Sequence, residues 1–219
     1  MDWASSYSTL EDPTAAAEQA ATALGPRLGD APPALVLAFF TAPLAAGAES
    51  MMAVLRERLR PGCLVGASGS AVIAAEREIE GGPALVLAAA QLPEVAVRPF
   101  ILAAASWGQA MEDPLEFARH TPGVAGAELV ILLGDPFSLD VERVLEAFNT
   151  HAPGVRVVGG MASAGTRPHS NVLVLNDWIA PEGGVAVALS GALRADVVVS
   201  QGCRPLGPAL EVTRAEHAC

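Results

Sequence analysis

The fold is decided by residues 155–207, VRVVGGMASAGTRPHSNVLVLNDWIAPEGGVAVALSGALRADVVVSQGCRPLG. Short apolar runs alternate here with glycine-containing turns, a pattern that predicts four short β-strands. Two corners are rich in small residues, GGMAS at 159–163 and SQGCRPLG at 200–207. Such corners indicate tight turns at the ends of the strands.

An earlier part of the chain follows the same pattern. ALVLAFF at 34–40 matches ELVILLG at 128–134, and CLVGASGSA at 63–71 matches VRVVGGMASAG at 155–165, with an offset of roughly 95 residues. An internal repeat of this length predicts two similar halves, at about 30–105 and 125–213, within one domain that spans 1–219. Chance similarity between apolar strands is the alternative interpretation.

Each half has the pattern of a strand, a helix and then four further strands. The first strand is apolar at nearly every position, so both of its faces should be covered. The helix covers one face, and the sheet of the other half is the nearest cover for the second face. We therefore expect an α+β fold in which two mixed, mostly antiparallel sheets pack together with helices outside, an αββα layering. One continuous sheet with helices on a single face is the alternative.

Two local predictions follow from the links within each half. Hairpin-length links, such as the one at Leu92-Pro93, predict that successive late strands pair antiparallel. Val72–Ile79 is expected to form one strand near an edge, Val95–Leu102 to close the first half, and residues 195–200 to close the second.

The composition excludes several classes of function. All 13 basic residues are arginine and the formal net charge is −11, so there is no lysine for a Schiff base or a phosphate loop, and nucleic acid is a disfavoured partner. No apolar run reaches about 18 residues, and the N-terminus does not resemble a signal peptide. The three cysteines and four histidines show no metal-ligand spacing. These features predict a cytoplasmic protein without a membrane segment or a metal site.

Four segments resemble the FIST family (F-box and intracellular signal transduction), specifically its N-terminal portion. They are VVGGMASAG at 157–165, Asn171 with the strand that follows, the turn at 183–185 and, above all, VVVSQGCRPLGPALEVT at 197–213. The resemblance implies a sensory domain that binds a small ligand, amino-acid-like or a small carboxylate, and signals to a partner such as a kinase or cyclase. One branch of the family binds haem and senses nitric oxide. Family members continue into a second portion, so this chain is either a natural short form or a truncated one.

The most specific candidate site lies in the second corner. Arg204 can bind a carboxylate through two hydrogen bonds, Gly202 permits a sharp turn, and Cys203 could serve as a nucleophile or sensor thiol. The simpler interpretation is that Arg204 bonds loop carbonyls and that Cys203 is a buried apolar residue.

Other candidates for ligand binding lie at strand ends. Gly160 with Ser163, and Ser68 in the matching corner of the first half, offer backbone N–H groups and hydroxyls to an anionic head group. Asp135 follows a buried strand, where α/β folds place binding sites. Tight turn geometry alone is the alternative for the corners, and a simple turn residue is the alternative for Asp135 and for Asp177.

The leading hypothesis is a sensory domain without catalytic activity. An enzyme that uses Cys203 with a histidine or Asp135 is the second hypothesis. A haem-based gas sensor with His120, His151 or His169 as the ligand is the third, although no other cofactor is indicated. An interaction module, with homo-oligomer formation, is the fourth.

Overall fold

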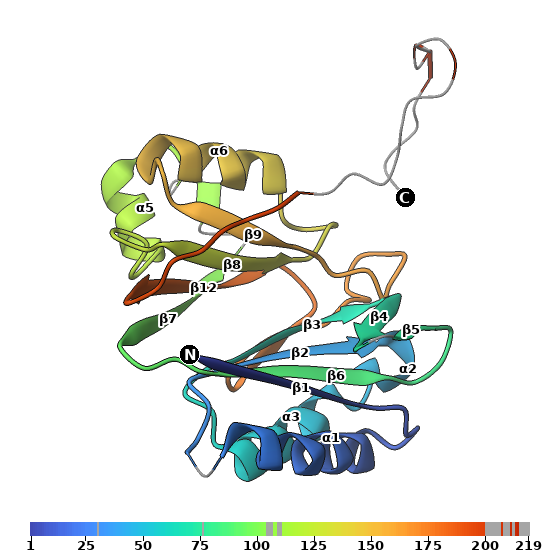
Figure 1. Cartoon of the computed structure of the whole chain (residues 1–219). Coiled ribbons are helices and arrows are strands. Elements are labelled where there is room, and N and C mark those ends of the chain that lie inside the picture. The colour runs from blue at the N-terminus through green and yellow to red at the C-terminus, as the bar shows by residue number, and fades with distance from the viewer. Residues whose placement is uncertain are drawn as a thin grey trace.

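Two β-sheets face each other in the computed structural model, and helices cover the outer face of each sheet (Figure 1). The structure describes residues 1–29, 31–75, 77–103, 107–108, 111–199, 207, 211 and 213–214. Within these residues the chain has mixed α and β content, with three open sheets. The predicted α+β fold with αββα layering is confirmed.

One sheet has six strands, and helices cover its outer face. Asp12 caps the first helix by accepting a hydrogen bond from the backbone N–H of Ala15, and small alanines let that helix pack closely on the sheet. Contrary to the usual effect of a Gly-Pro pair, the helix continues through Gly25-Pro26 to Leu28. In sheet order the strands are β1 (Asp2–Ser8), β6 (Leu85–Gln91), β2 (Leu35–Thr41), β3 (Leu64–Gly69), β10 (Leu173–Leu175) and β11 (Trp178–Ala180), with helices α1 (Pro13–Leu28), α2 (Ala42–Ala45) and α3 (Ala48–Leu59).

The other sheet has four strands, and two described helices cover its outer face. Its outer core is aromatic, since Phe117 and Phe148 pack edge to face with ring centroids 5.2 Å apart. In sheet order the strands are β7 (Val95–Leu102), β12 (Gly184–Gly191), β8 (Leu129–Gly134) and β9 (Arg156–Met161), with helices α5 (Pro114–His120) and α6 (Val141–His151).

Both sheets share one order of connections. Each sheet contains two parallel strands that are connected through a helix, β2 with β3 and β8 with β9. An antiparallel strand, β6 or β12, pairs with the first strand of each parallel pair. The other side of that antiparallel strand pairs with an antiparallel edge strand, β1 or β7. This correspondence supports a duplicated unit, although the division into halves at 30–105 and 125–213 stays a prediction.

The predicted hairpin between β6 and β7 is wrong. Both edges of β6 are already occupied, by β1 and by β2, so β7 cannot pair there. The short link at Leu92–Glu94 instead carries the chain from the six-stranded sheet to the four-stranded one, where β7 pairs with β12. Residues 2–8, for which the sequence pattern predicts no element, form the edge strand β1.

Two further strand predictions need correction. Residues 72–79 form a hairpin, β4 (Ala71–Ala74) with β5 (Arg77–Glu80), rather than a single strand. Ala75, with φ of 53°, lies in the turn that reverses the chain. Among the residues of 195–200 that the structure describes, 195–199, none is in a strand.

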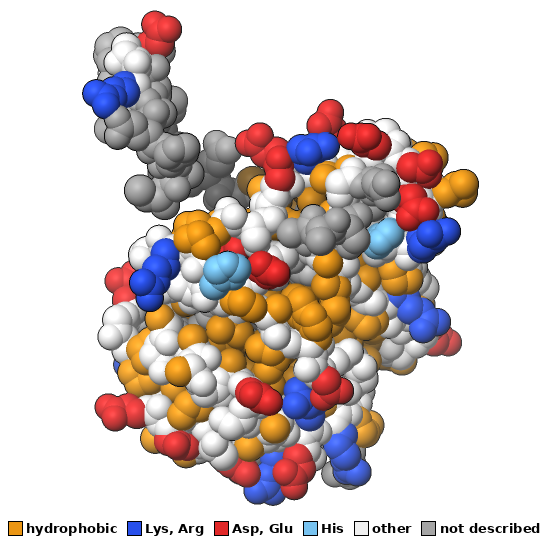
Figure 2. All heavy atoms as spheres, turned by 180° about the vertical axis from the view of Figure 1, so that it is seen from behind, with side chains coloured by type: hydrophobic (Ala, Val, Ile, Leu, Met, Phe, Trp, Pro, Cys, Tyr) orange, Lys and Arg blue, Asp and Glu red, His pale blue; other side chains and the backbone are white. Residues whose placement is uncertain are grey.

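The two sheets are held together by an apolar layer between them. Leu35 and Val65 of the six-stranded sheet and Leu133, Val185 and Val187 of the four-stranded sheet belong to this layer, and all are buried. Hydrophobic side chains are also exposed across the middle of the face opposite to that of Figure 1 (Figure 2).

In the part of the chain that the structure describes, no helix is long and apolar enough to cross a membrane.

Glycine is required at one equivalent place in each parallel strand pair. Gly66 pairs with Ala38 and Gly159 pairs with Leu132. A Cβ atom at either glycine would clash with the carbonyl oxygen of its paired residue. At both glycines the backbones of the two paired strands therefore lie closer together than they could with a larger residue at that position.

Replacing either glycine by alanine should destabilise the protein. We expect Gly66→Ala and Gly159→Ala each to lower the free energy of unfolding by about 2 kcal/mol or more, because the clash is with backbone that cannot move aside. Urea unfolding followed by circular dichroism measures this change. Gly82→Ala is the control, since the Cβ position of Gly82 has no atom within 4 Å; equal stability of all three variants would contradict the assignment.

Candidate functional site

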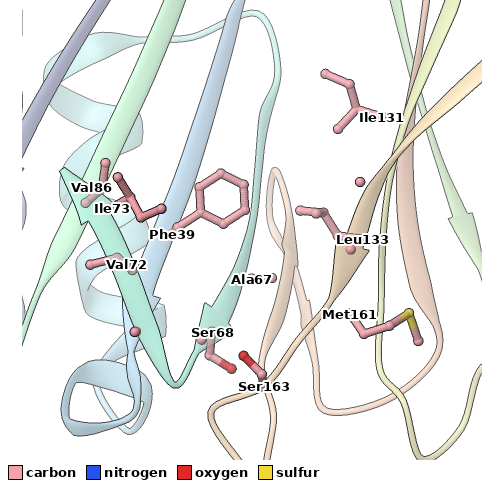
Figure 3. Close-up of a pocket in the computed structure, with 14 residues that line it drawn as sticks. Phe39, Ala67, Ser68, Val72, Ile73, Val86, Ile131, Leu133, Met161 and Ser163 are labelled. Atoms are coloured by element: carbon pink, nitrogen blue, oxygen red, sulfur yellow. The ribbon is translucent and has the colours of Figure 1, made fainter. Parts of the chain in front are cut away.

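A pocket of about 460 Å³ lies between the two sheets. Phe39 of β2, Val86 of β6 and Val72 of β4 form one wall, and Ile131 and Leu133 of β8 form the other (Figure 3). The remaining lining residues come from β3, β4, β9 and the corner that follows β9: Ala67, Ser68, Gly69, Ala71, Ile73, Gly159, Gly160, Met161 and Ser163.

Two serines connect the sheets at one end of the pocket, where Figure 3 shows them close together. The backbone N–H of Ser163 donates to the carbonyl oxygen of Ser68 over 3.1 Å, and the N–H of Ser70 donates to Oγ of Ser163, also over 3.1 Å. Oγ of Ser68 accepts the N–H of Val172 over 2.9 Å. Both hydroxyls thus accept backbone donors, which leaves the Ser68 hydrogen able to donate to a ligand oxygen. Oγ of Ser163 also lies 3.5 Å from Oγ of Ser70, so the Ser163 hydrogen can donate either to Ser70 or to a ligand.

The pocket is mainly apolar. Among its described lining residues none has a charged side chain, and Ser68 and Ser163 are the residues with polar side chains. Ser68 is buried, whereas Ser163 is exposed to solvent. The pocket therefore has an apolar interior and a hydroxyl-bearing end that reaches water, an arrangement suited to a molecule with a hydrocarbon body and a polar head.

Some of the predicted site residues come together and others do not. Ser68, Gly160 and Ser163 lie in one pocket, although Ser68 precedes the other two by more than about 90 residues in the sequence. Asp135 does not line it. The prediction for Gly202, Cys203 and Arg204 lies outside the described residues.

Asp135 is a buried carboxylate with a full set of partners. Its Oδ1 accepts from the Asn171 amide over 2.9 Å, and its Oδ2 accepts from the Ser138 hydroxyl over 2.6 Å and from the Phe137 N–H over 3.2 Å. The residue is 1% exposed. These bonds tie the loop after β8 to the segment that precedes β10. Asp177, in contrast, pairs at the surface with Arg56.

The apolar walls of the pocket were missed by sequence reasoning. Phe39, Ile131 and Leu133 belong to runs that are apolar at almost every position, so the sequence marks them as core and does not show where the two sheets leave a gap. The positions of the small-residue corners were the available signal, since both corners close one end of the pocket.

The described histidines lie elsewhere. His151 Nε2 contacts the carbonyl oxygen of Met111 at 3.0 Å, His120 Nδ1 contacts that of Glu116 at 2.9 Å, and His169 lies 3.8 Å from a Glu182 carboxylate oxygen at the surface. None of them lines the inter-sheet pocket. Within the described residues, no group of three or more metal-ligating side chains converges.

The described cysteine, Cys63, is part of the layer between the sheets. It is 1% exposed, and this burial raises the pKa of its thiol to about 12. Cys63 is therefore a packing residue, since a thiol that stays protonated is a poor nucleophile.

The fold and the pocket define an α+β domain with a small-molecule-sized cavity between two sheets that share one order of connections. Among protein families, the FIST N domain model matches residues 34–219 of this chain. The chain belongs to the FIST N domain family, and FIST domains are sensory domains of signal transduction.

Comparison with individual proteins finds similar chains in mycobacteria. An uncharacterized protein of Mycobacterium tuberculosis (strain ATCC 25618 / H37Rv) is 31% identical over 211 residues, which cover 96% of this chain and 53% of the relative. An uncharacterized protein of Mycobacterium bovis (strain ATCC BAA-935 / AF2122/97) is 34% identical over 204 residues, which cover 92% and 50%. The chain spans about half the length of these relatives.

Exchange of Asp135 tests its structural role. We expect Asp135→Asn to lower the free energy of unfolding by about 2 kcal/mol, because the new amide would place a donor against groups that already donate. Chemical unfolding provides the measurement. Asp177→Asn is the matched control and should change stability by less than about 0.5 kcal/mol, since its side chain is 88% exposed. Similar effects of the two variants would argue against a special role for the buried carboxylate.

The raised pKa of Cys63 predicts protection from alkylation. At pH 8, iodoacetamide should modify the Cys63 peptide in urea but hardly at all in the native protein, as read by peptide mass spectrometry. The thiol ionises in the unfolded chain at a lower pH than in the folded one, so its contribution to stability is present below pH ~9 and is lost as the pH rises toward 12. Native labelling at the rate of a free thiol would refute this assignment.

Proposed function

We propose that this domain senses a small ligand, amino-acid-like or a small carboxylate, which binds in the pocket between the two sheets. The observation that carries the proposal is the pocket itself, with Ser68 from one sheet and Ser163 from the corner of the other at its polar end. Its volume of about 460 Å³ lies in the range of ligand sites, roughly 300 to 1,000 Å³.

Residues of both sheets contribute to the pocket, and this supports a sensory role. A ligand that bonds to the serine hydroxyls contacts the place where the two layers are joined by hydrogen bonds. Binding there can shift the equilibrium between two arrangements of the sheets if the ligand has different affinities for them.

Other parts of the initial hypothesis stay predictions. They are the cytoplasmic location, a signalling partner such as a kinase or cyclase, and self-association. The haem sensor and the Cys203-dependent enzyme also stay predictions, because no described histidine lines the pocket and Cys203 lies outside the described residues.

Thermal-shift measurements with amino acids and small carboxylates test the proposal. We expect at least one compound to raise the melting temperature, and Ser163→Ala to weaken its binding about three- to tenfold through loss of one hydrogen bond. Ser163 is exposed, so the variant should fold. Ser50→Ala, on the outer helix α3, is the control and should bind normally. Failure of every compound to stabilise the folded protein would refute the proposal.

A further inference from the structure

Two neighbouring glycines in β9 are there for different reasons. A Cβ atom at Gly159 would clash with the backbone of Leu132, so the fold itself requires glycine at this position. At Gly160 the Cβ position has no heavy atom within 4 Å, and its φ is not in the left-handed range that favours glycine. Local packing therefore does not explain the absence of a side chain at Gly160.

The position of Gly160 shows what that absence provides. The register of β8 and β9 pairs Gly160 with Leu133, and residues paired in this way point to the same face of a sheet. Leu133 belongs to the layer between the sheets, and both residues line the pocket. Gly160 itself is exposed on the edge strand β9, so a side chain at 160 would extend from the open rim of the pocket toward this layer, and the space left by its absence is part of the pocket.

The polarity of the pocket is arranged along one direction. Ser68 and Ser163 lie together at one end, whereas Phe39, Ile131 and Val86 line the space away from them (Figure 3). No charged side chain is found among the described lining residues. A polar or charged body placed in this space would lose its hydration without gaining a partner.

We infer that Gly160 is the specificity-determining position of this pocket, and that its ligand is amphipathic, with a compact branched or aromatic hydrocarbon body and one head group that carries an oxygen acceptor. The hydrocarbon body lies between the sheets beside Gly160, and the head group accepts hydrogen bonds from the Ser68 and Ser163 hydroxyls at the solvent-exposed end. This inference rests on the proposed function and narrows its ligand class. Each methylene group buried in the apolar space would strengthen binding by about fourfold.

Isothermal titration with three probes tests the ligand class. 3-Phenylpropionate and 3-phenylpropionamide share an aromatic body and differ in the charge of the head group, whereas glutarate replaces the aromatic body with a second carboxylate. We expect both phenyl probes to bind at least tenfold more tightly than glutarate. Because the described lining provides no cation, the two phenyl probes should bind within about tenfold of each other.

Substitution at position 160 tests the assignment of this residue. Gly160→Leu should weaken the binding of 3-phenylpropionate at least tenfold by filling the space that its ring occupies, and Gly160→Ala should have a smaller effect in the same direction. Gly82→Leu is the matched control, since the Cβ position of Gly82 is equally open but lies in a turn outside the pocket. Its affinity should equal that of the wild type. Near-ultraviolet circular dichroism verifies that each variant is folded, and Gly160→Ala remains informative if Gly160→Leu does not fold.

The outcomes separate this inference from the proposed function. Tighter binding of glutarate than of either phenyl probe would overturn the amphipathic ligand and leave a ligand-binding pocket in place. A preference of more than tenfold for the carboxylate over the amide would overturn the conclusion that uncharged hydroxyl groups recognise the head group. Unchanged affinity in folded Gly160→Leu would overturn the role of Gly160. If neither these probes nor the amino acids and carboxylates bind to the folded wild type, the proposed function itself fails.

Discussion

The burial of one apolar face of each sheet against the other is the constraint on which the rest of this structure depends. An apolar face of a sheet needs cover, and here each sheet covers the other while helices cover the outer faces. The sheets are unequal, with six strands in one and four in the other. Strand β9 is an edge of the narrower sheet, and the pocket forms beside it, over the ends of β2, β3 and β6. The cavity is thus a consequence of packing two sheets of different width.

Parts of this arrangement could be predicted because they depend on local chemistry. The all-apolar strands around Val36 and Val130 require cover on both faces, and this requirement led to the four layers. The small-residue corners at Gly66 and Gly159 were recognisable as tight turns at strand ends. Their convergence at Ser68 and Ser163 follows from the shared order of connections in the two sheets.

Other parts could not be predicted, for identifiable physical reasons. The link at Leu92–Glu94 is short enough for a hairpin, but only knowledge that β1 occupies the edge of β6 shows that the chain must change sheets. Strand β1 has weak apolar alternation because Ser6 and Ser8 are buried. Their hydroxyls bond to the carbonyl oxygen of Ala20 and to the Gln19 side chain, so polar residues occupy places where the pattern leads one to expect apolar ones.

The residues that form the walls of the pocket could not be predicted from the sequence either. Leu133 lines the gap, whereas Val187 in the same layer does not, yet both residues stand in continuous apolar strands. What distinguishes them is the neighbour: Leu133 pairs with Gly160 across the β8–β9 ladder. A single sequence shows that Gly160 is small, but the consequence depends on which face of β9 it occupies, and the structure supplies that information.

The position of the polar end gives the pocket a physical connection to the rest of the domain. Ser68 bonds to Val172 through both its N–H and its hydroxyl, and the adjacent Asn171 donates to the buried Asp135. Asp135 in turn accepts from Ser138, whose hydroxyl oxygen accepts the N–H of Gly183 immediately before β12. Together with the peptide bond between Asn171 and Val172, these hydrogen bonds connect the pocket to the residue that precedes β12 in the opposite sheet. Removing a hydrogen-bond partner from a buried polar group costs free energy. A ligand that changes the hydrogen bonds of Ser68 therefore acts on a network whose bonds cannot be adjusted one at a time.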